Sequence, residues 1–352
     1  MAKILICGDV TKNETYTEFF ERGKDIFTPA LLDLYYSFDK RIINLESPIT
    51  EGLKPQKKYG ANFTFALTDL TGIKKLDAIC SISNNHALDY GVKGLNQTKK
   101  VLEENKIDFL GSKMREFIMI DDKVGVYSFC ENEFSIKNAC DYLSILDLLE
   151  VKDKVRKYKK QCKKLIVLYH GGKEFYPYPT PNNQKVCRAI ADSGADLVVM
   201  QHSHAVGCFE KYNGSTIVYG QGNFISDYTS NEYLKNGMMI SLDTKTDEIK
   251  FYFTAKGEKI DLTSYGEFYA RSDEITYSGF IEKEFKEYCE NNKFGYYDAL
   301  TQYGKGFKII NKLTKNKKLE KDFKRKKTAF RNFISTDTHK EILEEILGET
   351  DE

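Results

Sequence analysis

Short apolar segments that alternate with helical patterns constrain the fold of this chain most strongly. Helical periodicity covers Val92–Asn105 and Asn183–Ser193, and Gly194 is placed to cap the second helix. The apolar segments are three to six residues long and rich in β-branched residues, which is typical of strands in a sheet covered on both faces. Strand and helix alternation predicts a layered α/β domain. The six predicted strands are Ile4–Cys7, Arg41–Ile43, Ala78–Ser83, Leu165–Tyr169, Leu197–Met200 and Thr216–Tyr219.

The pattern changes after about residue 227. The stretch "MMISLDTKTDEIKFYFTAKGEKIDL" has alternating segments around a polar turn, which predicts a hairpin that extends or covers the sheet. From about residue 266, Lys, Glu, Tyr and Phe recur at helical spacing, and the chain ends in an apolar stripe of Ile342, Leu343, Ile346 and Leu347. We therefore predict an α/β domain over residues 1–262 and a helical, lysine-rich region over residues 263–352.

Composition favours a globular protein. The 352 residues are 41% hydrophobic and 30% charged, and no apolar run approaches the roughly 20 residues that a membrane-spanning helix needs. The N-terminus leads directly into the first predicted strand, without the succession typical of a signal peptide. Eight cysteines without a C-x-x-C pair indicate reduced thiols. We expect a cytoplasmic protein.

Positive charge is concentrated in residues 305–331, which hold twelve Lys and Arg residues against Glu320 and Asp322, although the whole chain has a net charge of only +1. Such a segment could make electrostatic contact with an anionic membrane or a polyanionic polymer. A solvated helix face is the alternative. Nucleic acid is not an expected partner, because the segment lacks the aromatic and basic interleaving of RNA-binding modules.

Polar side chains recur at the carboxyl ends of the predicted strands. In an open α/β sheet this edge is where ligands bind, so residues far apart in sequence should converge on one crevice. In chain order these residues are Asp9, Asn44, Glu46, Asn84, Asn85, His86, His170, His202, His204 and Asn223.

These residue types suit a binuclear metal site. Hard carboxylates and an amide oxygen, together with imidazoles, favour Mn, Fe or Zn, and the cysteines take no part. One histidine at a strand end is more often structural. Four of the five histidines of the chain stand at these strand ends, however, and this concentration favours metal binding and catalysis.

The motifs "CGDV", "NLESPIT", "SNNHALDYG", "HGGKEFYPYPTPNNQ", "ADLVVMQHSHAV" and "YGQGNF" resemble, in the same order, those of the CapA family of capsule and poly-γ-glutamate synthesis proteins. This family is a branch of the calcineurin-like metallophosphoesterases. The resemblance covers about residues 3–226 and implies a four-layer α/β sandwich with two divalent metal ions, with residues 1–262 forming that domain.

The resemblance also implies residue roles. His86 would be the general acid, Asp89 would orient its ring and Asn84 would fix the turn; plain turn and helix-cap chemistry is the alternative for Asn84 and Asp89. The metal ligands would be Asp9 and His204 for the first ion, Asn85, His170 and His202 for the second, and Glu46 as a bridging or single ligand.

The chain departs from the family pattern at several positions. Thr11 stands where the superfamily usually has a histidine ligand of the first metal. Gln201 replaces the glycine before the paired histidines, and Gly171 replaces the aromatic residue that commonly follows His170. The carboxylate motif is Asn-Leu-Glu instead of the Asp-based form, a change that CapA proteins share.

Several further residues are candidates for substrate binding. Lys58 lies in the loop "GLKPQKKYG", which could recruit anions or could be an ordinary solvated loop. Tyr176 lies in "FYPYPTP", which could stack on a sugar or base or could pack on its own aromatic residues. The complete set of substrate-binding candidates is Asn44, Asn84, Asn223, Lys58, Glu174 and Tyr176.

The function implied by the resemblance is a metal-dependent hydrolase of capsule or surface-polysaccharide biosynthesis. It would act on a phosphorylated sugar, a nucleotide-linked intermediate or a polyanionic polymer, and a metal-bound hydroxide would attack phosphorus. One alternative is a polymer-assembly component with a structural metal site, and another is amide-bond chemistry on a carboxylated polymer. Retention of His86 favours catalysis, because a structural site has no use for an unligated acid.

Overall fold

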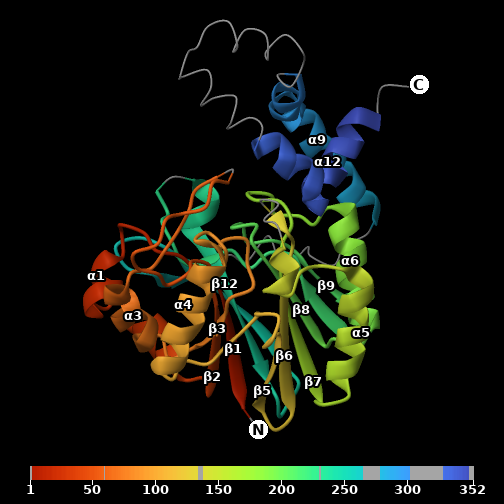
Figure 1. Ribbon diagram of the computed structural model, residues 1–352. Coiled ribbons are helices and arrows are strands. Elements are labelled where there is room, and N and C mark those ends of the chain that lie inside the picture. The colour runs from red at the N-terminus through yellow and green to blue at the C-terminus, as the bar shows by residue number, and fades with distance from the viewer. Residues whose placement is uncertain are drawn as a thin grey trace, which may run out of the picture.

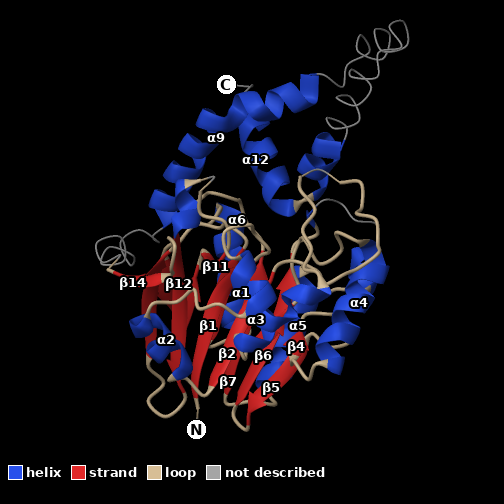
Figure 2. Cartoon of the chain, turned by 90° about the vertical axis from the view of Figure 1, so that its left-hand side faces the viewer, coloured by secondary structure: helices blue, strands red, loops and turns tan. Residues whose placement is uncertain are grey.

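Two β-sheets face each other in the computed structural model (Figures 1 and 2). The structure describes residues 2–58, 60–133, 138–229, 231–264, 278–301 and 328–348. The first sheet has the order β14-β13-β12-β1-β2-β3-β4 with β11 paired to β1, and the second has the order β5-β6-β7-β8-β10-β9. All six predicted strands are present, and they are divided equally between the two sheets as β1, β2, β3 and β7, β8, β10.

The strands of the first sheet are β1 (Lys3–Val10), β2 (Lys40–Leu45), β3 (Ile79–Ser81), β4 (Phe109–Leu110), β11 (Asn223–Ile225), β12 (Asn236–Asp243), β13 (Ile249–Ala255) and β14 (Asp261–Thr263). Those of the second are β5 (Phe117–Asp121), β6 (Val124–Cys130), β7 (Lys164–His170), β8 (Leu197–Gln201), β9 (Phe209–Tyr212) and β10 (Ser215–Val218). The α-helices that carry the argument below are α1 (Thr17–Arg22), α2 (Pro29–Tyr36), α3 (Leu70–Lys75), α4 (Gly91–Glu104), α5 (Leu148–Lys159), α6 (Pro181–Asp192), α9 (Ser278–Thr301) and α12 (Asp337–Gly348).

Successive side chains along each strand point to opposite faces of the sheet, and each face packs against a different layer. Ile4 and Ile6 of β1 share a buried cluster with Val199 of β8, so this face of each sheet packs against the other sheet. Leu5 and Cys7, on the opposite face of β1, pack with α1 to α4. Helices α5 and α6 cover the outer face of the second sheet in the same way. The expected four-layer α/β sandwich is confirmed, and each fully buried aliphatic side chain in it contributes about 1.5–3 kcal/mol.

Close backbone approach places β11 beside β1. A Cβ atom on Gly8 would lie 2.0 Å from the carbonyl oxygen of Gly222, so no larger residue fits at Gly8. This approach pairs Asp9 with Asn223 in parallel register. Asn223 therefore does not simply follow the strand before it, as the sequence suggested, because the chain crosses after β10 to the other sheet.

The predicted hairpin is confirmed as β12 and β13, and together with β14 it extends the first sheet. Farther along the chain, α9 and α12 lie above the carboxyl ends of the strands (Figure 1). They share a small core formed by Phe285, Cys289, Tyr296, Ile342, Leu343 and Ile346. Leu347, from the predicted apolar stripe, is 47% exposed. The division of the chain at residue 262 stays a prediction.

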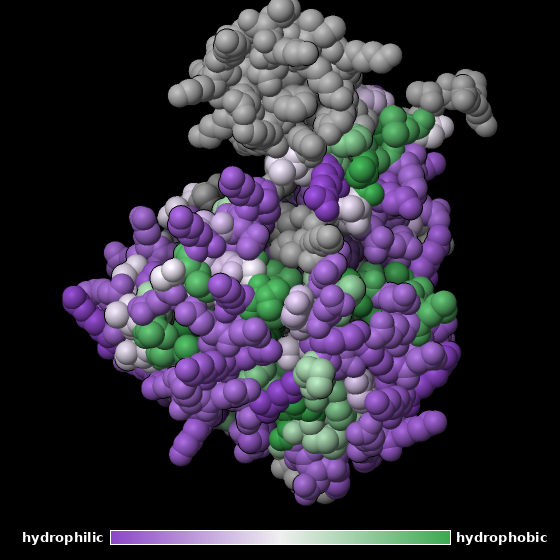
Figure 3. Space-filling view, in the orientation of Figure 1, coloured by the Kyte–Doolittle hydropathy of each residue, from purple (hydrophilic) through white to green (hydrophobic). Residues whose placement is uncertain are grey.

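The face of the molecule seen in Figure 3 is largely hydrophilic, with apolar side chains gathered in small areas. Within the described ranges, no helix combines the length and apolar character needed to cross a membrane. Residues 305–327, which carry most of the predicted basic segment, lie outside the described residues.

Candidate metal centre

The carboxyl ends of the central strands of both sheets meet at one edge of the sandwich. The structure brings together there all six side chains expected to bind metal. Asp9 lies inside β1, which is longer than predicted, and His170 is the last residue of β7. Glu46 directly follows β2, and His202 and His204 follow β8.

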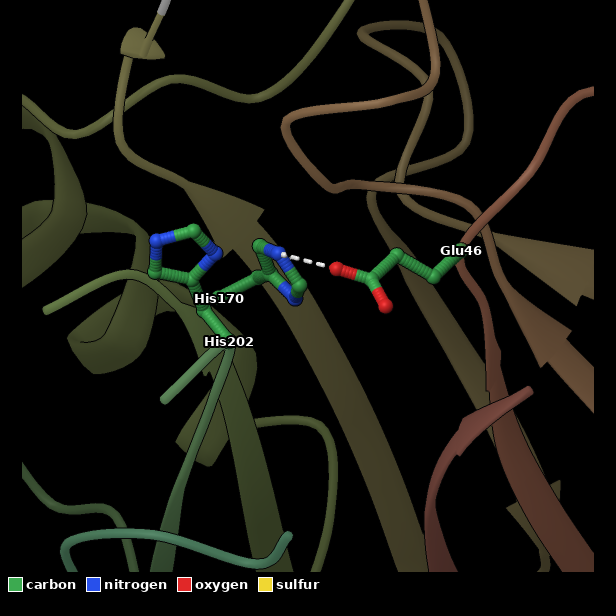
Figure 4. A group of neighbouring side chains, drawn as sticks. All are labelled: Glu46, His170 and His202. Carbon is green, nitrogen blue, oxygen red and sulfur yellow. Dashed lines mark ion pairs between the residues drawn. The ribbon is translucent and has the colours of Figure 1, made fainter. Parts of the chain in front are cut away.

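Two groups of three side chains at this edge could each hold a metal ion. The first contains Asp9, Glu46 and His204, and the second contains Glu46, His170 and His202, with the ligand atoms of each group within 4.8 Å of one another. Glu46 belongs to both groups. Figure 4 shows it reaching toward His170 from the opposite side, with 3.4 Å between Glu46 Oε1 and His170 Nε2. Asn85 Oδ1 lies 3.0 Å from the same nitrogen and adds an amide oxygen to the second group.

Several atoms of these groups are buried without a hydrogen-bond partner. Within the described part of the chain they are Asp9 Oδ2, both carboxylate oxygens of Glu46 and His202 Nδ1. Unsatisfied buried polar atoms each cost about 1–3 kcal/mol, and bound cations would satisfy the atoms concentrated here. Carboxylates, an amide and imidazoles fit divalent transition metals such as Mn, Fe or Zn. The residues present therefore fit two such ions, with Glu46 between them.

The two neighbouring carboxylates of the centre, Glu46 and Asp9, have pKa values that are shifted in opposite directions. Burial, followed by the negative charge of Asp9, raises the pKa of Glu46 well above its ordinary value. Burial would also raise the pKa of Asp9, but interactions with the imidazoles of His204, whose Nδ1 lies 3.6 Å from Asp9 Oδ2, and of His170 lower it overall. Without a cation, the two neighbouring carboxylates cannot both ionise cheaply.

Burial and neighbouring charges shift the pKa values of His170 and His204 in opposite directions. Burial, with the nearby His202, holds the pKa of His170 well below its ordinary value, so its ring is neutral and suited to ligate a metal. Burial also opposes the charge on His204, but Glu46 and Asp9 outweigh it and raise its pKa to about 10. In the protein without metal, a proton on His204 thus compensates the carboxylates. Metal binding would displace that proton.

Asparagine side chains orient the candidate ligands. Asn44 Nδ2 donates to Asp9 Oδ1 at 2.7 Å and lies 3.1 Å from His170 Nδ1. Asn84 Nδ2 in turn donates to Asn44 Oδ1 at 3.1 Å. Both amides are fully buried: Asn44 contacts two candidate ligands, whereas Asn84 contacts Asn44 and the backbone of Leu45 and His86. Neither faces the cavity, contrary to their selection as substrate-binding residues. Asn223 lines the cavity and also lies 2.8 Å from His204 Nδ1.

The candidate general acid belongs to a buried trio. His86 Nδ1 lies 2.8 Å from Asp89 Oδ2, and Lys58 forms an ion pair with the other Asp89 oxygen. The side chain of Lys58 is only 2% exposed, so the solvated-loop interpretation is wrong for this residue and its contacts are with Asp89 and His86. Burial lowers the pKa of His86, although the hydrogen bond with Asp89 opposes this shift.

Two residues at the centre were missed by sequence reasoning. Glu133 Oε2 accepts a hydrogen bond from Asn85 Nδ2 at 2.7 Å and lies 3.5 Å from His202 Nε2. His339, the fifth histidine, comes from α12 and places its Nε2 3.8 Å from Glu133 Oε1. Glu133 follows the strand β6, "VGVYSFC", whose β-branched and aromatic residues were a usable signal. No local pattern distinguishes His339 from other polar residues of its helix.

A cavity of about 640 Å³ opens over the centre. Glu174 lines it, as does Phe175, whereas Tyr176 is buried and packs on Tyr288 with 4.7 Å between ring centroids. Aromatic packing is thus the correct interpretation for Tyr176. Glu174 also forms a third group of possible metal ligands with Glu133 and His202.

Backbone strain is concentrated in the same loops. His202, His204 and Phe175 have φ angles of 90°, 55° and 58°, in a region that residues other than glycine rarely adopt. Strain of this kind is usually found at binding and active sites, where the surrounding structure enforces it.

The structure gives a physical reason for two of the three departures from the family pattern. Gln201 Nε2 donates to Gln221 Oε1 at 3.0 Å and lies 3.4 Å from the carbonyl oxygen of Cys7, so this amide links the two sheets. A Cβ atom on Gly171 would lie 2.9 Å from Glu131 Cγ, which leaves no room for an aromatic residue there. Thr11 lines the cavity, and among the residues that the structure describes none of its contacts supplies a replacement ligand.

Fold and site together define a four-layer α/β sandwich with a candidate binuclear metal centre at its carboxyl edge. Residues 3–228 match the family model for the bacterial capsule synthesis protein PGA_cap, and the chain belongs to this family. The expected family is thereby confirmed. The match ends before α9 and α12.

The chain is similar to two named relatives. It is 29% identical over 203 residues to the capsule biosynthesis protein CapA of Bacillus anthracis, covering 52% of this chain and 49% of that protein. It is 26% identical over 223 residues to the PGA biosynthesis protein CapA of Bacillus subtilis (strain 168), covering 59% of this chain and 58% of that protein. The chain thus matches about half of the length of these relatives.

Among solved structures, a hypothetical protein from Thermus thermophilus has a TM-score of 0.47 and 11% identity, covering 72% of this chain and all of that one. This TM-score is too low for any inference about function.

Proposed function

We propose that the protein is a metal-dependent phosphoesterase that hydrolyses a phosphorylated or nucleotide-linked intermediate in the synthesis of a capsule or surface polymer. The observation that carries this proposal is the sharing of Glu46 between two groups of buried ligands, with four ligand atoms left without partners in the described residues. Two adjacent cation sites suit the in-line displacement of a phosphoester.

In this proposal the ligands keep the roles that their positions suggest. Asp9 and His204 would hold the first ion, His170, His202 and Asn85 the second, and Glu46 both. Divalent ions bound there would polarise the phosphoryl oxygens and lower the pKa of a water molecule toward neutrality. Glu133 and Asn44 would keep the amide and imidazole ligands in the required orientation.

His86 would supply the proton for the leaving group. Asp89 engages Nδ1, so Nε2 is the nitrogen that would donate to the leaving oxygen as its bond to phosphorus breaks. The oxygen of the attacking water forms the new bond to phosphorus, and no covalent enzyme intermediate is required. An anionic phosphate in the cavity would raise the pKa of His86 toward the range in which it is protonated.

The names of the relatives support the choice of substrate class. Both are named for capsule or PGA biosynthesis, which fits a polymer precursor or a polyanionic partner. A cytoplasmic location and contact of residues 305–331 with an anionic membrane remain part of this proposal.

A substrate screen tests the proposal. Purified protein would be loaded with Mn, Zn or Mg and offered phosphomonoesters, phosphodiesters and nucleotide sugars, with metal content measured in parallel. We expect metal-dependent release of phosphate or of a phosphomonoester. If the metal-loaded protein hydrolyses none of these substrate classes, the phosphoesterase proposal is wrong, and a role in polymer assembly or in amide-bond chemistry replaces it.

A further inference from the structure

The helices after the family match are fixed to the sandwich by buried polar contacts. Thr338 Oγ1 donates to Glu131 Oε1 at 2.8 Å, and both side chains are buried. Glu341 accepts a hydrogen bond from the backbone nitrogen of Asn182 at 2.8 Å and another from the hydroxyl of Thr180, the N-cap of α6. A carboxylate at a helix N-terminus is favourable. These bonds hold α12 in one position above the metal centre.

A second set of contacts reaches the centre itself. Tyr296 Oη lies 2.8 Å from His339 Nδ1, and the other ring nitrogen of His339 faces Glu133. Glu133 also accepts a hydrogen bond from Asn85. A continuous series of contacts therefore links Tyr296 of α9, His339 of α12, Glu133 and the candidate metal ligand Asn85. The position of Tyr296 over the cavity is therefore coupled to the geometry of the site.

The cavity consequently has two chemically different walls. One wall carries the groups of the proposed phosphoester chemistry, including Glu46, His86 and His204. The opposite wall is aromatic and comes from the C-terminal region, with Tyr288 and Tyr296 of α9 and Phe333 from the segment before α12; Asn292 of α9 adds an amide group. Aromatic rings pack against the apolar faces of a ring-shaped ligand, and hydroxyl and amide groups bind its polar edge.

We propose that the C-terminal helices complete a subsite for the sugar of a phosphorylated carbohydrate, whose phosphate lies on the candidate metal centre. A cavity of about 640 Å³ lies within the usual range of small-molecule sites and matches a mono- or disaccharide phosphate in size. This inference rests on the proposed phosphoester hydrolysis for its catalytic readout, and a binding readout tests it separately.

The test compares two substrates with similar alkoxide leaving groups, the best hexose phosphate from the screen and the acyclic glycerol 2-phosphate. Tyr288→Ala should raise KM for the hexose phosphate roughly tenfold and leave kcat nearly unchanged, because a tenfold change corresponds to about 1.4 kcal/mol, which one aromatic contact can supply. Glycerol 2-phosphate should be hydrolysed as by the wild type. Tyr288→Phe keeps the ring and loses only the hydroxyl group, so its KM for the hexose phosphate should lie between those of the wild type and Tyr288→Ala.

Two further variants of the whole chain test whether misfolding explains the effect of Tyr288→Ala. Asn292 is an exposed residue that lines the cavity, so Asn292→Ala should weaken hexose phosphate binding without affecting folding. Phe294 lies on the same helix, is 76% exposed and is absent from the cavity wall, so Phe294→Ala is the matched control and should change nothing.

Calorimetric binding of the hexose phosphate to metal-loaded protein separates the two proposals. Binding without turnover that Tyr288→Ala weakens would retain the subsite and reject the phosphoesterase. Turnover of the hexose phosphate with no selective effect of either cavity variant would reject the subsite and retain the phosphoesterase. Absence of any binding would reject the subsite.

Discussion

Glu133 accepts a hydrogen bond from the side-chain amide of Asn85, with 2.7 Å between Glu133 Oε2 and Asn85 Nδ2. Since the amide nitrogen is engaged, the amide oxygen faces His170 Nε2, 3.0 Å away. The same carboxylate lies 3.5 Å from His202 Nε2, which leaves His202 Nδ1 as the ring nitrogen available to a metal. One carboxylate therefore orients two candidate ligands of the second ion.

Glu133→Ala should weaken metal binding by about 10- to 100-fold, the usual effect of removing a residue that orients metal ligands. The measurement is metal content after dialysis against a graded series of chelator concentrations. Glu116→Ala is the control, since Glu116 is also a buried carboxylate but bonds to Lys154 and Tyr158, away from the centre. Equal metal loss in both variants would show that the effect is general destabilisation.

If His202 is a metal ligand and His86 is the general acid, replacing each of them should affect metal content differently. The purified protein should contain one to two transition-metal ions per chain. His202→Ala should lose metal more readily than His86→Asn, because His202 belongs to a group of metal ligands and His86 does not. Elemental analysis of the two variants side by side checks this, and equal losses would overturn the assignment of roles.

The sequence predicted the central strands and the gathering of polar residues at their ends because both depend on local pattern. Buried strands are short apolar runs, and a polar residue that ends such a run is conspicuous. Asp9, His170 and His202 were found in this way. Their convergence follows from parallel strands sharing one edge, although here the edge belongs to two sheets.

The remaining features depend on tertiary contacts that have no local signature. Lys58 lies in a charged loop that reads as solvated, and only packing shows that it is buried against Asp89. His339 reaches Glu133 across a sequence separation of about two hundred residues, on a helix whose polar face is otherwise ordinary. The division of the strands between two sheets follows from β11 and β12 pairing with β1, which the order of elements alone does not specify.

The buried side chain of Lys256 should make the free energy of unfolding depend on pH. Its ammonium nitrogen is buried and has no hydrogen-bond partner within the described residues; burial lowers the pKa from 10.5 to about 7, although the charge of Asp9 opposes the shift. The folded chain thus binds fewer protons than the unfolded chain between these two values, and stability falls as the pH drops through that window. The penalty is complete below about pH 7.

Lys256→Met should therefore raise the free energy of unfolding by a few kcal/mol below pH 7, and the gain should shrink as the pH approaches 10.5. Denaturant unfolding across this pH range, with chelator present so that metal binding does not contribute, measures the effect. Lys250→Met is the control, because Lys250 is exposed on β13 and its replacement should have little effect. A gain that is constant with pH would mean that packing, not charge, is responsible.

Catalysis provides the most demanding prediction. His86→Asn should lower turnover of an alkyl phosphate by about 10²–10⁴-fold, the usual contribution of a positioned general acid, while metal content stays near that of the wild type. The loss should be much smaller for p-nitrophenyl phosphate, because the phenolate is stabilised and leaves with little protonation, whereas a sugar alkoxide needs a proton. Asp89→Asn should show a weaker version of the same pattern, since Asp89 acts only through the ring of His86. Steady-state rates for the two substrates with both variants test the role as well as the residue. If His86→Asn lowers both rates equally, His86 has a role in binding or structure; if alkyl phosphate hydrolysis is unchanged, another group supplies the proton and the mechanism proposed for this centre is wrong.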